Sequence, residues 1–329
     1  KTYRIERFLG VGTVGTVYVA RHVRSGGLYA VKILHRKLAA SPDLYQRFQD
    51  EARLIATLRH PHIVPITDFD RDENGIPFFV MDLLEGESLQ QRLKHKETLP
   101  VAQALEIVQQ IGSARHAAHR SGIVHRNVKP ENVFLVRHDL GDRVTETAKV
   151  TDFGLARFRR MAPAGTRDAS LGVSQFMAPE LLQETSAPID ARVDQWALSV
   201  IAFRMLSGKL PFDEGSPEEQ AEHICNDTPR ALGKLVPELP PHIAVAISRG
   251  MAKRKEASFT EADIEIPAEL LAGIDEDSLK DDEEWIDESI GARGGKRKKA
   301  KGPAAKGAKQ DKKKAPKKRG WGDEDDFSW

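Results

Sequence analysis

The sequence predicts an α+β protein with a two-lobed fold: a small five-stranded β lobe with one helix, a larger α-rich lobe, and a disordered, charged C-terminal tail. Three observations support this prediction. Apolar residues alternate in steps of two within residues 5–36, and they recur about every 3.6 residues in segments beyond residue 100. Beyond residue 260 the charges separate into long blocks of one sign, which is typical of solvated, unfolded chain.

Three antiparallel strands are expected within residues 5–36, because glycines interrupt the alternation where turns are needed. The spacing changes to the helical period at Pro42, and this helix should end before the His-Pro pair at 60–61. Residues 63–66 and 76–84 return to strand character on either side of a turn-rich segment. Five strands and one helix therefore make up the small lobe.

The second lobe is predicted to be helical. Apolar residues from Val101 to Ala114 follow the helical period, so a helix should run from about residue 101 to about residue 120. Further helical spacing is found at residues 176–184, 193–207, 217–224 and 239–251. With 329 residues, of which 40% are hydrophobic, the chain can bury one large core.

The net charge of +1 hides a strong segregation of charge. Residues 261–290 hold 13 acidic residues against one lysine, residues 291–320 hold 14 basic residues against one aspartate, and residues 321–329 hold four acids. We therefore expect three parts: a folded domain in residues 1–260, an acidic and partly apolar segment in 261–290, and a disordered basic tail with an acidic-aromatic end in 291–329.

Several roles are open for this tail. The basic residues 291–320 are either a solubilising segment or a weak docking segment for nucleic acid or another polyanion, with an affinity that falls as salt rises. An anionic membrane surface is a third candidate. Residues 261–290 are apolar enough to fold against a partner. The last nine residues have the composition of a short peptide ligand, and they could equally fold back on the basic run.

Cysteine content and hydropathy bear on the compartment. The single cysteine, Cys225, excludes an internal disulfide and a cysteine-based metal cluster. No stretch approaches the ~20 uninterrupted apolar residues of a transmembrane helix, and the first residues lack the apolar core of a signal peptide. We expect a cytoplasmic protein.

The first chemical signal is a glycine-rich loop at residues 10–15, between two expected strands. Glycines let backbone N–H groups approach phosphate oxygens closely, although a glycine-rich hairpin without a ligand has the same appearance. A helix would have to follow for a dinucleotide site, and a strand follows instead. Lys32 lies in the middle of a later expected strand, where a lysine usually faces water. Neither signal is decisive alone.

The order and spacing of later motifs change this interpretation. A glutamate lies on the next helix, followed by His-Arg-Asn-Val-Lys-Pro-Glu-Asn at 125–132, Asp-Phe-Gly at 152–154 and Ala-Pro-Glu at 178–180. In this series the chain resembles the bacterial (Hanks-type) Ser/Thr protein kinases, from about Tyr3 to about Phe259. The resemblance implies the two-lobed kinase fold and a protein substrate or signalling partner.

By this resemblance, ATP and Mg²⁺ are the expected cofactors. Lys32 would hold the α- and β-phosphates through an ion pair with Glu51, and Lys129 would meet the γ-phosphate. Asn132 and Asp152 would hold Mg²⁺. The residues expected around the rest of the nucleotide are Gly10, Gly12, Gly15, Val17, Ala30, Met81, Asp82, Leu84 and Phe134. Ile55, Ile66, His125 and Phe153 would stack as the regulatory spine.

Three positions depart from the family pattern. Asn127 stands where the family has the catalytic aspartate, whose carboxylate takes the proton of the substrate hydroxyl. Val173 replaces a threonine whose hydroxyl links that aspartate to the phosphate-binding lysine. Ser258 replaces an arginine that pairs with Glu180.

Two functions therefore compete. The first is an ATP-binding pseudokinase or scaffold with impaired phosphotransfer. The second is an active Ser/Thr kinase that transfers the γ-phosphate of ATP to protein. An isolated Asn127 could have been engineered to inactivate a kinase. Since Val173 affects the same hydrogen-bond network, natural loss of activity is the preferred interpretation.

Overall fold

The structure is a computed structural model, which describes residues 2–12, 15–36, 42–139, 141, 144–153, 174–183 and 189–253. In the first helix, the side chains at 42–45, 47, 48, 50 and 51 lie outside the description. Contacts divide the chain into Lys1–Ile274 and Asp275–Trp329. The predictions for the tail beyond residue 260 lie outside the described residues.

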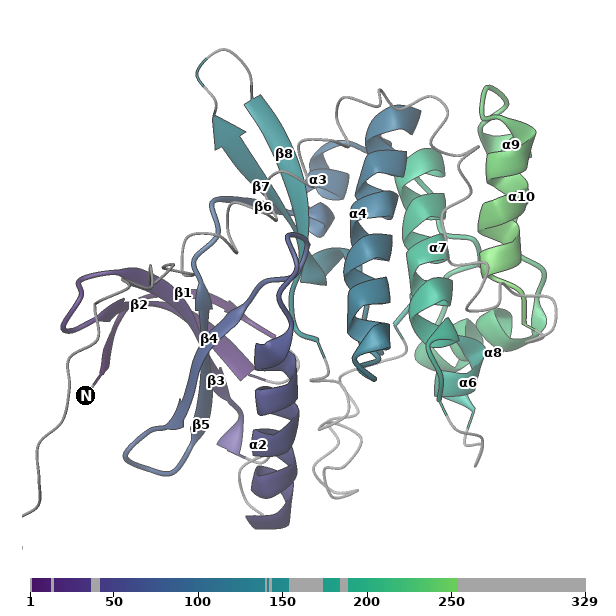
Figure 1. The fold of residues 1–329 in the computed structure, drawn as a ribbon. Coiled ribbons are helices and arrows are strands. Elements are labelled where there is room, and N and C mark those ends of the chain that lie inside the picture. The colour runs from purple at the N-terminus through teal and green to yellow at the C-terminus, as the bar shows by residue number, and fades with distance from the viewer. Residues whose placement is uncertain are drawn as a thin grey trace, which may run out of the picture. The chain divides into compact units, whose positions relative to one another are not determined.

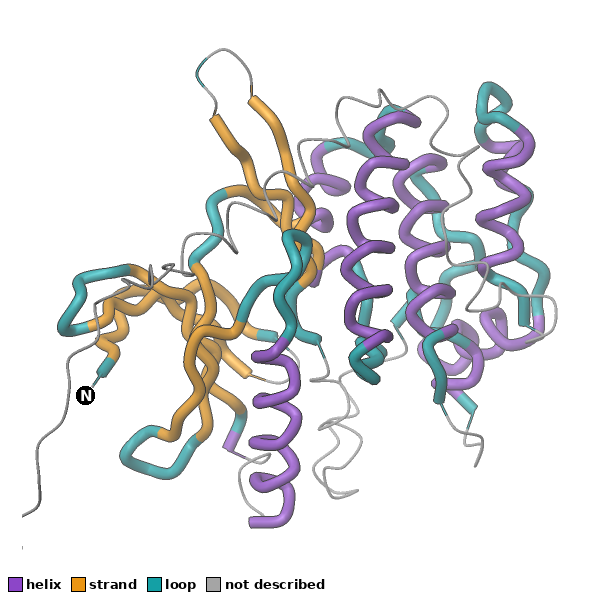
Figure 2. Tube along the Cα trace, viewed as in Figure 1, coloured by secondary structure: helices purple, strands orange, loops and turns teal. Residues whose placement is uncertain are grey.

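The N-terminal lobe is an antiparallel five-stranded sheet in the order β1-β2-β3-β5-β4, as Figures 1 and 2 show. Its elements are β1 (Tyr3–Val11), β2 (Gly15–His22), β3 (Leu28–Leu34), α2 (Pro42–Thr57), β4 (Ile66–Arg71) and β5 (Pro77–Asp82). The three strands within residues 5–36 and the helix that starts at Pro42 are confirmed.

The helix α2 joins two apolar clusters. Its buried Ala52 packs with Leu34 of β3 and Phe79 of β5. Farther along the helix, Ile55 belongs to the large core of the second lobe, as does Leu58 just beyond the helix end. Burying a side chain the size of isoleucine or leucine stabilises the folded state by roughly 1.5–3 kcal/mol. Because these apolar contacts lie in both lobes, α2 is held by both.

A second sheet of three strands, in the order β6-β7-β8, follows. It contains β6 (Gly86–Ser88), β7 (Val133–Asp139) and β8 (Val144–Val150). Ser88 begins α3 (Leu89–His95) with a capping box, in which the Ser88 and Gln91 side chains each accept from the other's backbone N–H. These elements were not among the sequence predictions.

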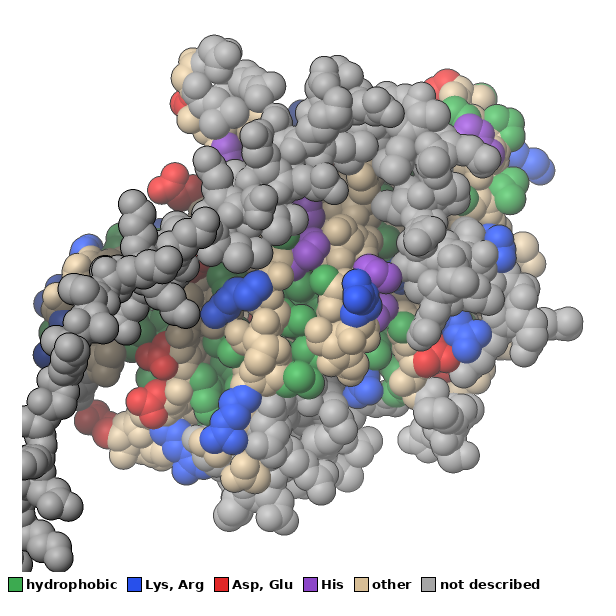
Figure 3. Space-filling model, in the orientation of Figure 1, with side chains coloured by type: hydrophobic (Ala, Val, Ile, Leu, Met, Phe, Trp, Pro, Cys, Tyr) green, Lys and Arg blue, Asp and Glu red, His purple; other side chains and the backbone are tan. Residues whose placement is uncertain are grey.

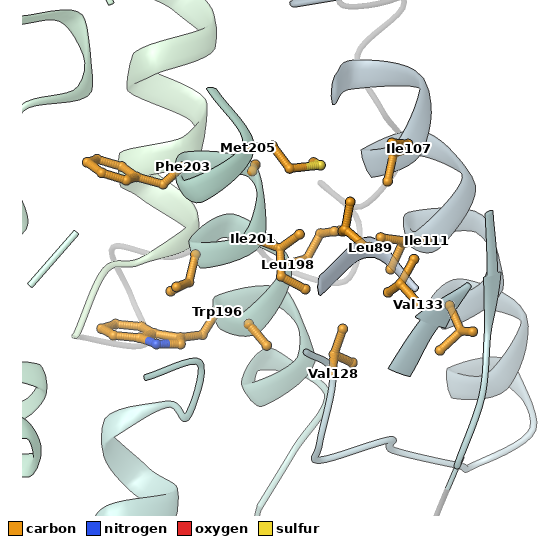
Figure 4. Packing of buried hydrophobic residues seen from close by; sticks show 14 of the residues in the cluster. Leu89, Ile107, Ile111, Val128, Val133, Trp196, Leu198, Ile201, Phe203 and Met205 are labelled. Atoms are coloured by element: carbon orange, nitrogen blue, oxygen red, sulfur yellow. The ribbon is translucent and has the colours of Figure 1, made fainter. Parts of the chain in front are cut away.

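Helices make up the rest of the described chain. They are α4 (Val101–Arg120), the 3₁₀ turn η1 (Pro130–Asn132), α6 (Pro179–Leu182), α7 (Arg192–Ser207), α8 (Pro217–Asn226), α9 (Leu232–Leu235) and α10 (Pro241–Gly250). Helix α7 is buried on nearly every side. Figure 4 shows its apolar side chains, including Leu198 and Ile201, beside Ile107 and Ile111 of α4. This packing forms the main core.

The predicted α+β, two-lobed fold class is confirmed, with two local corrections. The strand expected at 63–66 begins only at Ile66, because residues 62–64 pair instead with Val150 at the end of β8. The helix expected at 176–184 is a four-residue turn of helix, α6. The first difference arises from non-local pairing, whereas α6 begins at Pro179, a residue that suits the first position of a helix.

The described surface carries charges of both signs. On the face drawn in Figure 3, blue and red side chains are scattered among tan and green ones. None of the described helices combines the length and the apolar character that crossing a bilayer requires.

Candidate active site

Strand pairing gathers four of the predicted residues on one face of the N-terminal sheet. Val17 lies opposite Lys32, and Ala30 lies opposite Met81. Directly paired residues point to the same side of a sheet, and the residues at 30 and 32 of β3 share a face. Lys32 is only 2% exposed. A buried ammonium group therefore lies beside an apolar surface of Val17, Ala30 and Met81.

The partner of this ammonium group is Asp152. Lys32 Nζ lies 2.6 Å from Asp152 Oδ2. A pair this close interacts more strongly than an exposed one, because little water screens it. Asp152 has a φ of 64°, a backbone conformation that is rare for a residue other than glycine and that tertiary contacts must hold. The side chain of Glu51, the partner predicted for Lys32, lies outside the described residues.

The glycine-rich loop approaches Lys32 closely. Gly12 N–H donates to the carbonyl of Gly15 at 2.8 Å. A Cβ added at Gly12 would lie 3.7 Å from Lys32 Nζ, and one added at Gly15 would lie 2.3 Å from the carbonyl oxygen of Ile33. Glycine at 15 is therefore required by its close approach to β3, whereas a Cβ at Gly10 would meet nothing within 4 Å.

The segment 125–132 is anchored by Asp194 at the start of α7. The Asp194 carboxylate accepts hydrogen bonds from the backbone N–H of His125 (2.8 Å) and of Arg126 (2.7 Å), and from Nε2 of His119 (2.8 Å). Burial by itself would raise the pKa of Asp194, but the hydrogen bond from His119 and the interactions with His125 hold it below its ordinary value. Arg126 takes a φ of 64° in this anchored loop.

Asn127 lies within this loop. Its backbone N–H donates to His125 Nδ1 at 3.3 Å, and its carbonyl accepts from Asn132 Nδ2 at 2.8 Å. His125 Nε2 in turn donates to the carbonyl of Thr151 at 2.8 Å. The backbone at Asn127 is therefore fixed from both sides. Within the described part of the chain, the amino group of Lys129 makes no hydrogen bond or ion pair.

The residues expected to stack as a spine are close together in the core. The rings of His125 and Phe153 are 4.6 Å apart. Phe153 and Ile55 belong to the same buried cluster, and Ile66 packs against it. The chain next to Asp152 is thus tied to α2 and β4.

The side-chain oxygens of Asn132 and Asp152 are of the type that suits a hard divalent cation. Asn132 uses its amide nitrogen toward Asn127, and Asp152 uses Oδ2 toward Lys32. Among the described residues, Oδ1 of each makes no hydrogen bond. A carboxylate with an amide oxygen is the donor type that Mg²⁺ prefers. No described group of three or more His, Cys, Asp and Glu residues has the arrangement of a metal site, so phosphate or water oxygens would have to complete the shell.

The remaining predicted residues surround the end of β5. Asp82 ends β5, and Leu84 lies just beyond it. Gly86 then turns with a φ of 145°, and a Cβ there would lie 2.0 Å from the carbonyl oxygen of Leu135, so only glycine fits. Phe134 of β7 pairs with Ser88 of β6.

The fold and the motifs of this site are those of a known protein family. The family described as protein kinase domain matches residues 3–256. This chain belongs to the protein kinase family. The relatives it resembles include bacterial Ser/Thr kinases.

Serine/threonine-protein kinase Pkn1 of Myxococcus xanthus is 36% identical over 260 residues, a match that covers 78% of this chain and 36% of that protein. PknA of Mycobacterium tuberculosis is 34% identical over 257 residues, covering 76% of this chain and 56% of that protein. The chain therefore spans about a third to a half of the lengths of these relatives. The crystal structure of the M. tuberculosis PknI kinase domain is similar at a TM-score of 0.62 and 28% identity, over 82% of this chain and 96% of that one.

The other two departures from the family pattern are at positions 173 and 258. Val173 and Ser258 lie outside the described residues. Glu180, at the first turn of α6, makes no ion pair within the described part of the chain. Sequence reasoning missed Asp194 and His119 as anchors of the segment 125–132. The available signal was an aspartate in the first turn of an otherwise apolar helix.

Proposed function

We propose that this kinase domain binds Mg²⁺-ATP and acts as a signalling or scaffold protein with impaired phosphotransfer. The observation that carries the proposal is Asn127, an amide on a fixed loop where the family has the catalytic carboxylate. The comparisons support the Ser/Thr kinase domain itself.

Nucleotide binding is supported by the arrangement around Lys32. Its ammonium group lies 2.6 Å from Asp152 and close to Gly12, where a polyphosphate would meet a cation beside glycine backbone. The apolar face formed by Val17, Ala30 and Met81 suits the adenine ring. We assign the backbone of Asp82 and Leu84 to its polar edge, and Phe134 to its other face. Glu51 is proposed as a second partner of Lys32.

Mg²⁺ fits the Oδ1 atoms of Asn132 and Asp152, which make no hydrogen bond among the described residues. When bound, it neutralises charge on the phosphates. In the proposed complex Asp152 would release Lys32, whose ammonium group would then orient the α- and β-phosphates. Lys129, which has no partner among the described residues, is placed to approach the γ-phosphate. These roles require binding and orientation only, and Asn127 does not impair them.

Phosphotransfer requires more than orientation. A carboxylate at position 127 would accept the hydrogen bond of a substrate hydroxyl and take its proton, whereas an amide cannot take a proton. A positioned base typically contributes about 10²–10⁴-fold to the rate. We therefore propose that the chain transfers phosphate at least about a hundredfold more slowly than its Asn127→Asp variant.

An active Ser/Thr kinase is the second candidate, because the relatives carry the name serine/threonine-protein kinase. Transfer of labelled γ-phosphate to a generic protein substrate tests both. We expect the wild-type chain to match Lys32→Ala, and Asn127→Asp to exceed both. Wild-type transfer well above that of Lys32→Ala would favour the active kinase.

The partner is proposed to be a protein, recruited through the folded domain or the tail. The family match ends at residue 256, which supports a domain boundary near residue 260, with separate segments at 261–290 and 291–329. The 14 basic residues in 291–320 support weak, salt-sensitive docking on a polyanion such as nucleic acid.

A further inference from the structure

His35 reaches the glycine-rich loop from the end of β3. Its Nε2 lies 3.2 Å from the carbonyl oxygen of Gly12. Because a carbonyl oxygen can only accept, the ring must donate an N–H from Nε2. His35 is half-buried and follows Leu34, the last residue of the strand that carries Lys32. One short segment therefore supplies two side chains that meet the same loop.

Gly12 lies close to Lys32 and is held by two hydrogen bonds. Lys32 Nζ lies within van der Waals reach of the position that a Cβ on Gly12 would take, at 3.7 Å. Gly12 N–H is paired with the carbonyl of Gly15 at 2.8 Å. The N–H of Gly12 thus bonds across the loop, and its carbonyl bonds to His35. In this arrangement Gly12 is fixed close to Lys32, next to the place proposed for the phosphates.

We propose that His35 is a positioning residue for the nucleotide phosphates, which fixes Gly12 beside Lys32 through the Gly12 carbonyl. This inference rests on the proposed nucleotide binding. Glycine-rich backbone has more freedom to lose on ordering than any other. A hydrogen bond that orders the loop before the ligand arrives removes part of that cost from binding.

The effect of losing the His35 hydrogen bond should depend on whether the ligand carries phosphates. The hydrogen bond acts on the loop above Lys32, whereas the surface assigned to adenine comes from Ala30 and Met81, which pair with each other across β3 and β5. Loss of the His35 contact should therefore weaken binding of ATP and leave binding of adenosine unchanged. General damage to the lobe would weaken both ligands alike.

The test compares four full-length chains: wild type, His35→Leu, His35→Gln and His138→Leu. Leucine fills similar space without a donor, and the glutamine amide restores an N–H at the same reach. His138 is an exposed histidine of β7 and provides the matched control. Isothermal titration measures Mg²⁺-ATP and adenosine. Hydrogen exchange without ligand reports on the loop that includes residues 10–15.

We expect His35→Leu to weaken ATP binding about three- to tenfold, the range for one hydrogen bond. Adenosine binding should be unchanged, and the loop amides should exchange faster. His35→Gln and His138→Leu should match the wild type. Three results would each overturn this inference while leaving the proposed function intact. They are unchanged ATP binding and loop exchange in His35→Leu, an equal loss of adenosine binding in that variant, and failure of His35→Gln to restore ATP binding. A wild-type chain that binds neither ligand would overturn the proposed function and this inference together.

Discussion

Lys32 Nζ and Asp152 Oδ2 lie 2.6 Å apart, although 120 residues separate them in the chain. The contact joins β3 of the small lobe to the segment that follows β8. It places a cation and an anion together where the nucleotide phosphates and Mg²⁺ are proposed to bind. In the proposed nucleotide complex, Lys32 would leave Asp152 and contact the phosphates, and Asp152 would hold Mg²⁺ instead.

Nucleotide should stabilise the folded domain through this site. We expect Mg²⁺-ATP to raise the melting temperature, with a stabilisation of about 2.7 kcal/mol at roughly a hundredfold excess over Kd. Lys32→Ala should abolish the shift, whereas replacing the exposed Lys94 of α3 by alanine should preserve it. Differential scanning fluorimetry with and without nucleotide measures this. Equal melting curves for the wild type would exclude the proposed binding.

Restoring a carboxylate should restore chemistry. Asn127→Asp should raise the transfer of phosphate to protein by about 10²-fold or more, because the side chain can then accept the substrate proton. The double variant Asn127→Asp/Val173→Thr should exceed the single variant, since the threonine hydroxyl completes the family's hydrogen-bond network. Both should bind Mg²⁺-ATP as the wild type does. Rates that stay at the level of Lys32→Ala would contradict the role assigned to Asn127.

Arg92 of α3 should be an important stabilising cation. Its guanidinium group donates to Glu146 of β8 at 2.6 and 3.0 Å and to Glu87 of β6 at 2.6 Å. The hydrogen bond from Arg92 holds the pKa of Glu146 below its ordinary value. Arg92→Met should lower the free energy of unfolding by about 1–3 kcal/mol, a range reduced from that of fully buried pairs because both carboxylates are partly exposed.

The surface pair Arg21–Glu6, with the same 2.6 Å separation, provides the matched control for Arg92. Arg21→Met should change the stability far less, because an exposed pair gains little over its hydration. Urea denaturation of both variants checks the difference. Similar losses for the two variants would show that burial does not set the strength of the Arg92 contacts.

Because of His60, the free energy of unfolding should fall in mild acid. Burial, followed by the nearby His62 and Lys149, lowers the pKa of His60 from 6.5 to about 4. As pH falls from 6.5 to about 4, the unfolded chain binds a proton at this residue and the folded chain does not, so stability decreases over that interval. Chemical denaturation from about pH 7 to about pH 5 should show a smaller loss for His60→Asn than for wild type. The same slope in both would disprove the assignment.

The basic tail should bind polyanions without reading their sequence. With 14 basic residues in 291–320, the full chain should bind a generic duplex weakly at low salt, with an affinity that falls steeply as salt rises. Deletion of 321–329 removes four acids and should tighten binding. Deletion of 291–329 should abolish it. Binding that survives this second deletion would place the contact on the kinase domain.

Long periodic segments were predictable from sequence. Helix α4 begins and ends at the expected residues, because a 20-residue amphipathic pattern has one favourable conformation in a folded chain. The conformation of short apolar segments was not predictable from sequence. Residues 63–66 have strand character, yet the strand begins at Ile66 because Val64 N–H bonds to the carbonyl of Val150. That partner lies on β8, far along the chain.

The sequence by itself determined the family, the two lobes and the identity of the candidate site residues, because motif order and hydrophobic period are properties of the chain alone. Tertiary structure decided which of these residues touch. It pairs Lys32 with Asp152, ties the Gly12 carbonyl to His35, and sets three hydrogen-bond donors on Asp194. Such contacts depend on how distant segments pack and on which polar groups must be hydrogen-bonded once they are buried. The local spacing of residues along the chain determines neither.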